Sequence, residues 1–398
     1  MAVTPGQPRI ERFILVYALA WAGGAIAYTP FLTLLLPERI ADLLGPARAV
    51  DWLSGIAFCG AVAASAAHIA FGYASDITRN RRGWIAAGLV LSSAVLAIFP
   101  AVSGFWPTIG VVVLWQCGLN MMLAPLAALA GDVVPDARKG LLGGALSFAP
   151  ALGAASGALV TWPGLAASDA RPAVVAGLVV ACLVPVLLIR LPRPPGGQPD
   201  AATGAGQADA EARGRNRKVV VRMWLARLSL QIAEAALFAF LYLWFRAIDP
   251  SLGASGTAIV FGAVLVVSTP VALAVGRWAD RHGRPLAPLS ACAAVSAVGL
   301  AAMALSRGTV PAIAAYGLFG VASSVFLALH SAQTLRILPR PDRRGRDLGF
   351  FNLTNTTPSL VMPALALALV PTFGFAGLFA TLAGLAALAA VLVPRIRA

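Results

Sequence analysis

Long apolar stretches recur along the whole chain and set the strongest limit on its fold. Each is about 20 residues long, which is the length at which an α-helix crosses the hydrocarbon core of a bilayer. Charged residues make up only 12% of the 398 residues, whereas a typical soluble domain has about 25%. A membrane β-barrel would show short alternating segments instead. The sequence therefore predicts an all-α polytopic membrane protein.

Twelve transmembrane spans are predicted, six in each half of the chain. We place them at about 13–36, 53–74, 84–103, 106–130, 140–162 and 172–190, and at about 221–246, 255–275, 286–306, 309–335, 348–370 and 374–394. Between the halves lies a segment rich in Pro, Gly, Ala and charge, which cannot bury a core. We therefore expect one six-helix bundle over 1–192, a flexible cytoplasmic linker over 193–217, and a second six-helix bundle over 218–398.

One motif occurs at matching places in the two halves. Its residues are Gly72, Asp76, Arg79 and Gly83 in the first copy, and Gly276, Asp280, Arg281, Gly283 and Arg284 in the second. The two leading glycines are 204 positions apart, and so are the two aspartates. Pro135 and Pro339, in two further short loops, have the same offset. Many transporters are built from such repeats, so we predict two pseudo-symmetric bundles.

The basic residues are distributed unevenly between the two sides of the membrane. Of the 30 Lys and Arg residues, 23 fall in the N-terminus, the loops after even-numbered spans, and the C-terminus. The positive-inside rule therefore puts both termini in the cytoplasm. The same bias accounts for most of the net charge of +14, so we expect no nucleic-acid partner. The four cysteines lie in apolar stretches without paired spacing, and we expect no metal site.

The doubled motif and the twelve-span plan resemble the major facilitator superfamily. The family signature is Gly, three residues, Asp, then basic residues around a second Gly, and both copies here match it, the first with one extra residue. The resemblance implies a transporter that works by alternating access, and we expect it to be a monomer. It also implies that the motif latches the two halves together when the transporter faces outward. We expect Asp76 to pair with the start of the eleventh span and Asp280 with the start of the fifth.

Two finer resemblances bear on the transported solute. The string from Thr78 to Trp84 resembles the loop of the sugar–cation symporter branch, in which an ion-binding acid lies one helical turn before the glycine. His68 occupies that position here, so the cation site is not carried over. The fifth span, with Pro150 and Gly153, loosely resembles the antiporter motif of drug exporters. The missing symporter acid favours export over sugar uptake, and the exporter motif adds little because Ala149 stands where that motif prefers Gly.

An ionisable residue at membrane depth is costly and indicates function by default. Arg227, Gln231 and Glu234 in the seventh span are spaced i, i+4 and i+7, so they share one helix face. We predict proton coupling through Glu234 and Arg227, with His68 and His330 as further titratable groups. The alternative is a fixed Arg227–Glu234 structural pair, with each histidine serving as a satisfied hydrogen-bonding group.

Polar and aromatic side chains in other spans are candidates for binding the solute. The predicted cavity residues are Tyr28, Trp115, Gln116, Asn120 and Gln231. Gln116 and Asn120 lie one turn apart on the fourth span, which lines the central path in the family. Such side chains can equally well join helices to one another.

The chain shows no P-loop, metal-ligand spacing or nucleophile–base motif, so we expect neither an enzyme nor a cofactor. The sequence predicts a secondary active transporter of the bacterial inner membrane that moves a small neutral or amphipathic solute with protons. The alternatives are an uptake symporter for a sugar or metabolite, and a non-transporting assembly or delivery factor with the same fold.

Overall fold

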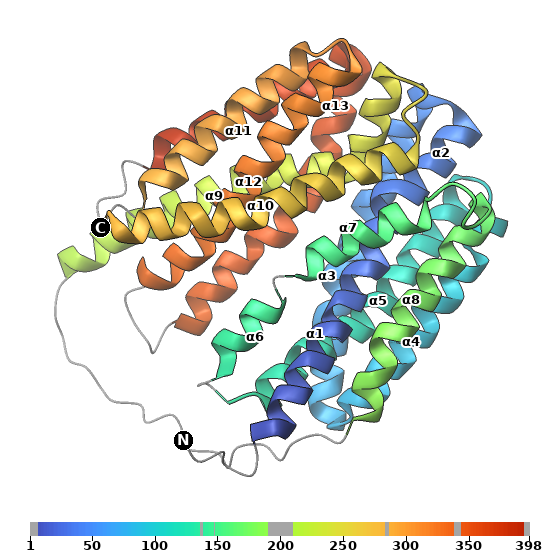
Figure 1. The fold of residues 1–398 in the computed structure, drawn as a ribbon, viewed down its shortest axis with the longest axis vertical. Helices are drawn as coiled ribbons and strands as arrows, with labels where there is room; N and C mark the ends of the chain where they lie inside the picture. Colours follow the sequence, from blue (N-terminus) through green and yellow to red (C-terminus); the bar gives the residue numbers. More distant parts are fainter. Residues whose placement is uncertain are drawn as a thin grey trace. The chain divides into compact units, whose positions relative to one another are not determined.

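The structure is a computed structural model that describes residues 7–135, 138–146, 148–189, 210–282, 286–337 and 344–393. Every regular element in these ranges is a helix (Figure 1). The helices of the first half are α1 (Gln7–Pro30), α2 (Leu36–Leu44), α3 (Pro46–Thr78), α4 (Arg81–Ile98), α5 (Phe105–Val133), α6 (Lys139–Leu146), α7 (Ala149–Val160) and α8 (Arg171–Leu188). A π-helical segment, η1 (Phe31–Leu35), joins α1 to α2.

The helices of the second half are α9 (Ala210–Ile248), α10 (Ala254–Arg281), α11 (Ala287–Leu305), α12 (Thr309–Ile337) and α13 (Arg344–Leu392). The prediction of a flexible linker over 193–217 is wrong for its last residues, because residues 210–217 form the first two turns of α9. This stretch contains helix-favouring Ala, Glu and Arg residues. The rest of the predicted linker lies outside the described residues.

Three of the predicted spans are divided among the helices in an unexpected way. The fifth is made of two helices, α6 and α7, and Pro150 lies in the first turn of α7, where its missing N–H is not needed. The eleventh and twelfth form one element, α13, interrupted at Gly374 with φ 64° and ψ −171°. A straight helix of 49 residues would be about 74 Å long, more than twice the hydrocarbon core. α13 therefore provides two spans.

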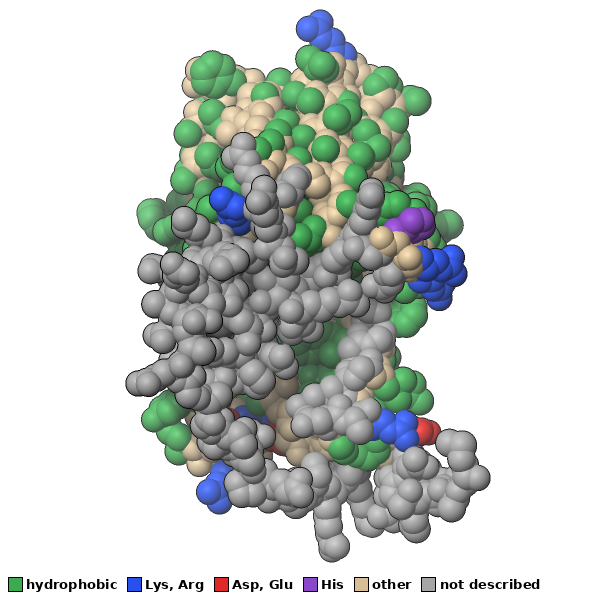
Figure 2. All heavy atoms as spheres, turned by 90° about the vertical axis from the view of Figure 1, so that its left-hand side faces the viewer, with side chains coloured by type: hydrophobic (Ala, Val, Ile, Leu, Met, Phe, Trp, Pro, Cys, Tyr) green, Lys and Arg blue, Asp and Glu red, His purple; other side chains and the backbone are tan. Residues whose placement is uncertain are grey.

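The described residues hold ten helices long and apolar enough to cross a membrane, with the two arms of α13 counted as one. The second arm of α13 and the α6–α7 pair complete the predicted set of twelve. Large apolar side chains such as Ile69, Val266 and Leu305 are mostly exposed, as expected of a surface that faces lipid. Figure 2 shows hydrophobic side chains over much of the described part of one face. The chain is a multi-pass membrane protein.

The chain divides into two compact units. The first comprises Met1–Leu43, Gly55–Pro199 and Ala254–Gly262, and the second comprises Leu44–Ser54, Asp200–Gly253 and Ala263–Ala398. In the first unit α1 packs on α7 and α8, and α4 packs on α5 and α8 (Figure 1). In the second unit α9 packs on α13, and α11 packs on α12 and α13. Equivalent helices thus form equivalent pairs, which agrees with the duplication in the sequence.

Two glycines let these equivalent pairs approach closely. A Cβ atom built on Gly88 of α4 would lie 2.4 Å from the backbone nitrogen of Met122 in α5. A Cβ atom built on Gly299 of α11 would lie 2.6 Å from the backbone nitrogen of Phe319 in α12. Small residues at such crossings allow backbone-to-backbone packing where the bilayer gives no hydrophobic driving force.

Candidate functional site

A polar cluster in the second unit joins the middle of α9 to α12. The carboxylate of Glu234 accepts a hydrogen bond from Ser323 Oγ of α12. Ser323 is fully buried, and its hydroxyl also lies 3.3 Å from the carbonyl oxygen of Gly320 one turn earlier. This cluster puts a titratable acid and a rotatable hydroxyl together within two membrane-spanning helices.

The other two residues of the predicted α9 face, Arg227 and Gln231, also form side-chain hydrogen bonds. Arg227 donates from Nε to Gln231 Oε1 at 3.2 Å and from Nη1 to Ser331 Oγ of α12 at 2.8 Å. Arg227 and Glu234 are therefore each held by a different serine of α12. Sequence reasoning found the α9 face but missed Ser323, whose only signal was a hydroxyl inside an apolar span.

His330 has the environment of a structural histidine. Its side chain is fully buried and its ring packs on Phe326 with the centroids 5.5 Å apart. Nε2 lies 2.9 Å from the carbonyl oxygen of Met223. A carbonyl can only accept, so Nε2 carries a hydrogen and donates it. This arrangement favours the hydrogen-bonding alternative for His330 over a role in proton coupling.

The predicted polar residues of the first unit form a chain between α3 and α5. His68 Nδ1 lies 3.2 Å from Asn120 Oδ1, and Asn120 Nδ2 donates to the carbonyl oxygen of Gln116 at 2.9 Å. His68 is exposed whereas Asn120 is buried. The structure thus brings the side chains of His68 and Asn120 together, while Gln116 takes part through its backbone carbonyl.

The two aromatic residues predicted to line the cavity both pack against other side chains of the first unit. Trp115 is fully buried and meets Phe31 edge-on, with the ring centroids 4.7 Å apart. Tyr28 packs against the small residues Ala22, Ala25 and Ala149. The Trp115 indole therefore fills the core at this position, and a role for it in lining a solute cavity stays a prediction.

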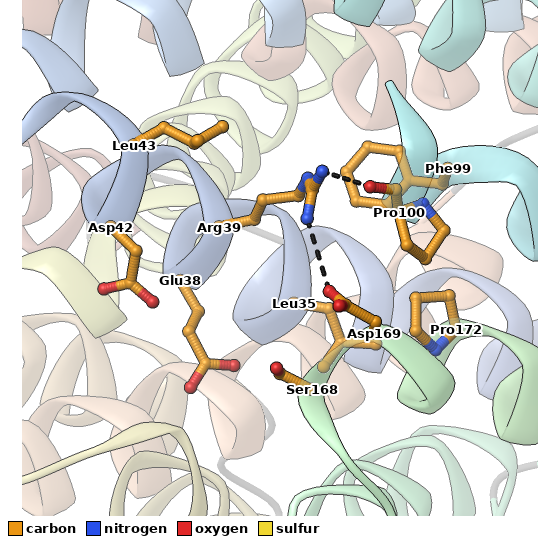
Figure 3. Close-up of a pocket in the computed structure, with 10 residues that line it drawn as sticks. All are labelled: Leu35, Glu38, Arg39, Asp42, Leu43, Phe99, Pro100, Ser168, Asp169 and Pro172. Carbon is orange, nitrogen blue, oxygen red and sulfur yellow. Dashed lines mark hydrogen bonds and ion pairs between the residues drawn. The ribbon is translucent and has the colours of Figure 1, made fainter. Parts of the chain in front are cut away.

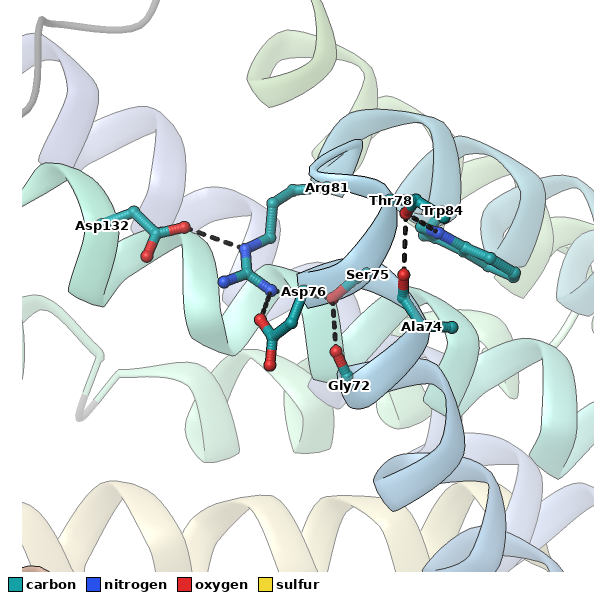
Figure 4. Close-up of polar contacts among 8 residues, drawn as sticks. All are labelled: Gly72, Ala74, Ser75, Asp76, Thr78, Arg81, Trp84 and Asp132. Atoms are coloured by element: carbon teal, nitrogen blue, oxygen red, sulfur yellow. Dashed lines mark hydrogen bonds and ion pairs between the residues drawn. The ribbon is translucent and has the colours of Figure 1, made fainter.

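The first copy of the doubled motif is held together by Arg81, which the sequence analysis had not singled out (Figure 4). Its guanidinium lies between two carboxylates, 2.5 Å from Asp76 Oδ1 and 2.9 Å from Asp132 Oδ2. It also donates to Ser75 Oγ at 2.8 Å. Arg81 thus ties the end of α3 to the end of α5.

Other residues of the first copy shape the turn between α3 and α4. Arg79 has a φ of 50°, in the left-handed region, where it ends α3. Asn80 then caps α4, since its Oδ1 accepts from the Gly83 N–H at 2.9 Å. A Cβ atom on Gly83 would lie 2.3 Å from the Asn80 side chain, so glycine makes room for this cap.

The proposed latch itself remains a prediction. A Cβ atom on Gly72 would lie 3.8 Å from Ala124, and one on Gly276 would lie 3.4 Å from Leu329, so both positions have room for a methyl group. Arg281 is exposed. Gly283, Arg284 and the side chain of Asp280 lie outside what the structure describes.

A second charged cluster, missed by the sequence analysis, lies around α2 in the first unit (Figure 3). Arg39 pairs with Asp169 at 3.6 Å, donates to the carbonyl oxygens of Pro100 and Val102, and lies over the Phe99 ring. The pocket beside it has a volume of about 170 Å³. Arg39 thus links α2 to the segments before α5 and α8, which makes it a structural clamp.

We expect Arg39→Lys to lower the stability of the first unit by about 1–2 kcal/mol, because lysine cannot reproduce the fork of donors that reaches two carbonyls. Asp169→Asn should change stability by less than about 0.5 kcal/mol, since that side chain is 78% exposed. Thermal unfolding in detergent measures both. Equal losses for the two variants would contradict the assignment of the clamp to the carbonyl contacts.

Comparison with known proteins addresses the fold directly. The family model described as Major Facilitator Superfamily matches residues 13–272 and 223–397. A solved structure of the peptide transporter POT has a TM-score of 0.76 at 14% identity and covers 99% of each chain. The nucleoside transporter NupG has a TM-score of 0.71 at 13% identity, covering 97% of this chain and all of its own. A comparison with curated protein sequences finds no match. At these identities the structural likeness concerns the fold alone.

Proposed function

Because the chain belongs to the major facilitator superfamily, it is a membrane transporter rather than an enzyme, and we propose that it exports a small neutral or amphipathic solute in exchange for protons. We place it in a bacterial inner membrane with both termini in the cytoplasm, on the evidence of the basic loops. The two units are proposed to alternate access to the solute.

The observation that carries proton coupling is the Glu234–Ser323 contact. Among the acidic residues that the structure describes, Glu234 is the one in the middle of a span, and the others lie near helix ends or between helices. A carboxylate at this depth can lose its charge by binding a proton. Proton coupling requires a charge that is present in one step of the transport cycle and absent in another.

Ser323 offers a way to pass the protonation of Glu234 to the helix backbone. Its single hydroxyl hydrogen can be donated to the Glu234 carboxylate or to the Gly320 carbonyl, but not fully to both. When Glu234 is protonated, its own O–H can donate to Ser323 Oγ, and the serine can then turn to Gly320. Gly320 packs closely on α10, since a Cβ atom there would lie 2.6 Å from Val264 Cγ1. Proton binding would thus alter hydrogen bonding where α12 meets α10.

We expect Ser323→Ala to keep transport but to move the midpoint of its pH profile towards alkaline pH, because the charged carboxylate loses its hydroxyl donor. Initial transport rates measured between pH 5 and 9 give this midpoint. Ser324→Ala is the matched control, since it removes a neighbouring hydroxyl from the same helix. A Ser323→Ala profile that coincides with that of the control would rule out the switch.

The solute class follows from the composition of the predicted binding groups. Gln116, Asn120 and Gln231 offer neutral amides, which suit an uncharged polar group on the solute. His68 stands where the sugar–cation symporter branch has its acid, which favours export over symport. The solved structures with this fold include nucleoside and peptide transporters, so nucleosides and short peptides belong in a test panel.

The proposal is tested by a transport screen in proteoliposomes with an imposed pH gradient. The panel holds nucleosides, dipeptides, sugars and hydrophobic amines. We expect at least one solute to move against the direction of the proton flux, together with a matching change in internal pH. Movement in the same direction as the protons would favour the uptake symporter. The absence of transport for all solutes, with the protein correctly folded, would favour the assembly or delivery factor.

A further inference from the structure

An apolar groove lies in the second unit between α10, α11 and α12. Its walls include Val271 and Trp278 of α10, Cys292 and Val295 of α11, and Leu318 and Val325 of α12. Its volume is about 780 Å³, many times the roughly 30 Å³ that one water molecule occupies in the liquid. A space this large and this apolar has room for a chain-like apolar group.

One end of this groove is basic. On α10, Val271, Ala274, Trp278 and Arg281 are spaced i, i+3, i+7 and i+10, so the groove-lining stripe continues directly into Arg281. His282 extends the same end, because its ring stacks on Trp278 with the centroids 4.7 Å apart. Arg281 and His282 are both exposed. The groove therefore has an apolar body and a polar end with hydrogen-bond donors.

The charges around this end favour an anion. From Ser251 to Pro341 the sequence has one acidic residue, Asp280, whereas Arg277, Arg281 and Arg284 lie within the same few positions. The positive-inside rule puts this end at the cytoplasmic face, where the leaflet carries anionic lipids. A tryptophan beside it matches the preference of indole rings for the membrane interface.

We propose that this groove is a binding site for an anionic phospholipid of the cytoplasmic leaflet. One acyl chain lies between α10, α11 and α12, and the headgroup phosphate meets Arg281 and His282. Phosphate oxygens accept charge-assisted hydrogen bonds from a guanidinium, and the acyl chain removes apolar side chains from contact with bulk lipid. The site does not depend on which solute the transporter carries.

Quenching of Trp278 fluorescence by brominated lipids tests the site. The intact protein is reconstituted in mixtures of phosphatidylcholine with dibrominated phosphatidylglycerol or dibrominated phosphatidylcholine, and the signal of Trp278→Phe is subtracted to isolate Trp278 from the other tryptophans. We expect the brominated anionic lipid to compete for this position about fivefold better than the zwitterionic lipid. This is the increase in affinity that one contact between a basic side chain and an anionic lipid gives. Arg281→Gln should remove this preference.

Arg307→Gln is the matched control, because it removes an exposed arginine from the same unit and should leave the preference unchanged. Equal quenching by the two brominated lipids in the wild-type protein would reduce the groove to an unselective lipid contact and overturn the proposal. A preference that survives Arg281→Gln would overturn the placement of the headgroup. The comparison of the two lipids needs no variant except Trp278→Phe, so it holds even where Arg281→Gln folds poorly.

Discussion

Replacing Glu234 with glutamine is expected to abolish transport driven by a pH gradient, while leaving the fold and solute binding in place. Glutamine keeps the size of the side chain and an oxygen that can accept from Ser323 Oγ. It cannot bind or release a proton in the physiological range. If the exchange depends on this proton, the gradient can no longer do work on the solute. We expect the gradient-driven rate to fall by at least tenfold, about 1.4 kcal/mol in the barrier.

The measurement is uptake or efflux of the identified solute in proteoliposomes with and without the gradient. Asp51→Asn is the matched control, since it removes a carboxylate at an exposed position and should keep the wild-type rate. Exchange of solute for solute, without a gradient, should survive in Glu234→Gln and shows that the variant is folded. Gradient-driven transport that persists in this variant would remove Glu234 from the mechanism.

The sequence was informative where periodicity and charge carry the signal. The helical spacing of Arg227, Gln231 and Glu234 predicted one face, and all three have hydrogen-bonding partners on or beside that face. The partner of Glu234 was not predictable, because the register between α9 and α12 is set by packing that no single-chain pattern records. A serine in an apolar span gives no indication of which helix it faces.

The doubled motif shows the same limit. Its spacing placed the loop between α3 and α4 correctly, and it directed attention to Arg79. The structure instead uses Arg79 to end the helix at positive φ and Arg81 to join Asp76 and Asp132. Which of several neighbouring arginines reaches a carboxylate depends on the turn geometry that Asn80 and Gly83 produce. The packing of Trp115 on Phe31 was not predictable for a related reason, since an aromatic ring in a span can face either a cavity or a core.

The largest expected effect on stability is that of Gly88→Ala in the first unit. The atoms nearest to an added Cβ are the nitrogen of Met122 at 2.4 Å, the oxygen of Gly118 at 2.7 Å and the carbonyl carbon of Met121 at 2.9 Å. All three belong to the backbone, so no side-chain rotation can relieve the clash. α4 and α5 must move apart, and overpacking of this kind costs about 1–3 kcal/mol.

Gly177→Ala in α8 is the control that separates packing from helix propensity. No heavy atom lies within 4 Å of a Cβ atom built there, so alanine should be neutral or should stabilise the helix by up to about 1 kcal/mol. In the second unit Gly299→Ala should behave like Gly88→Ala, and Gly317→Ala like the control, because the added Cβ atoms meet the Phe319 backbone and open space respectively. Thermal unfolding in detergent measures all four variants. If Gly88→Ala proves as stable as Gly177→Ala, close backbone contact between α4 and α5 does not stabilise the first unit. If Gly299→Ala loses as much stability as Gly88→Ala, the two bundles are stabilised by the same kind of helix contact, as the duplication of the sequence implies.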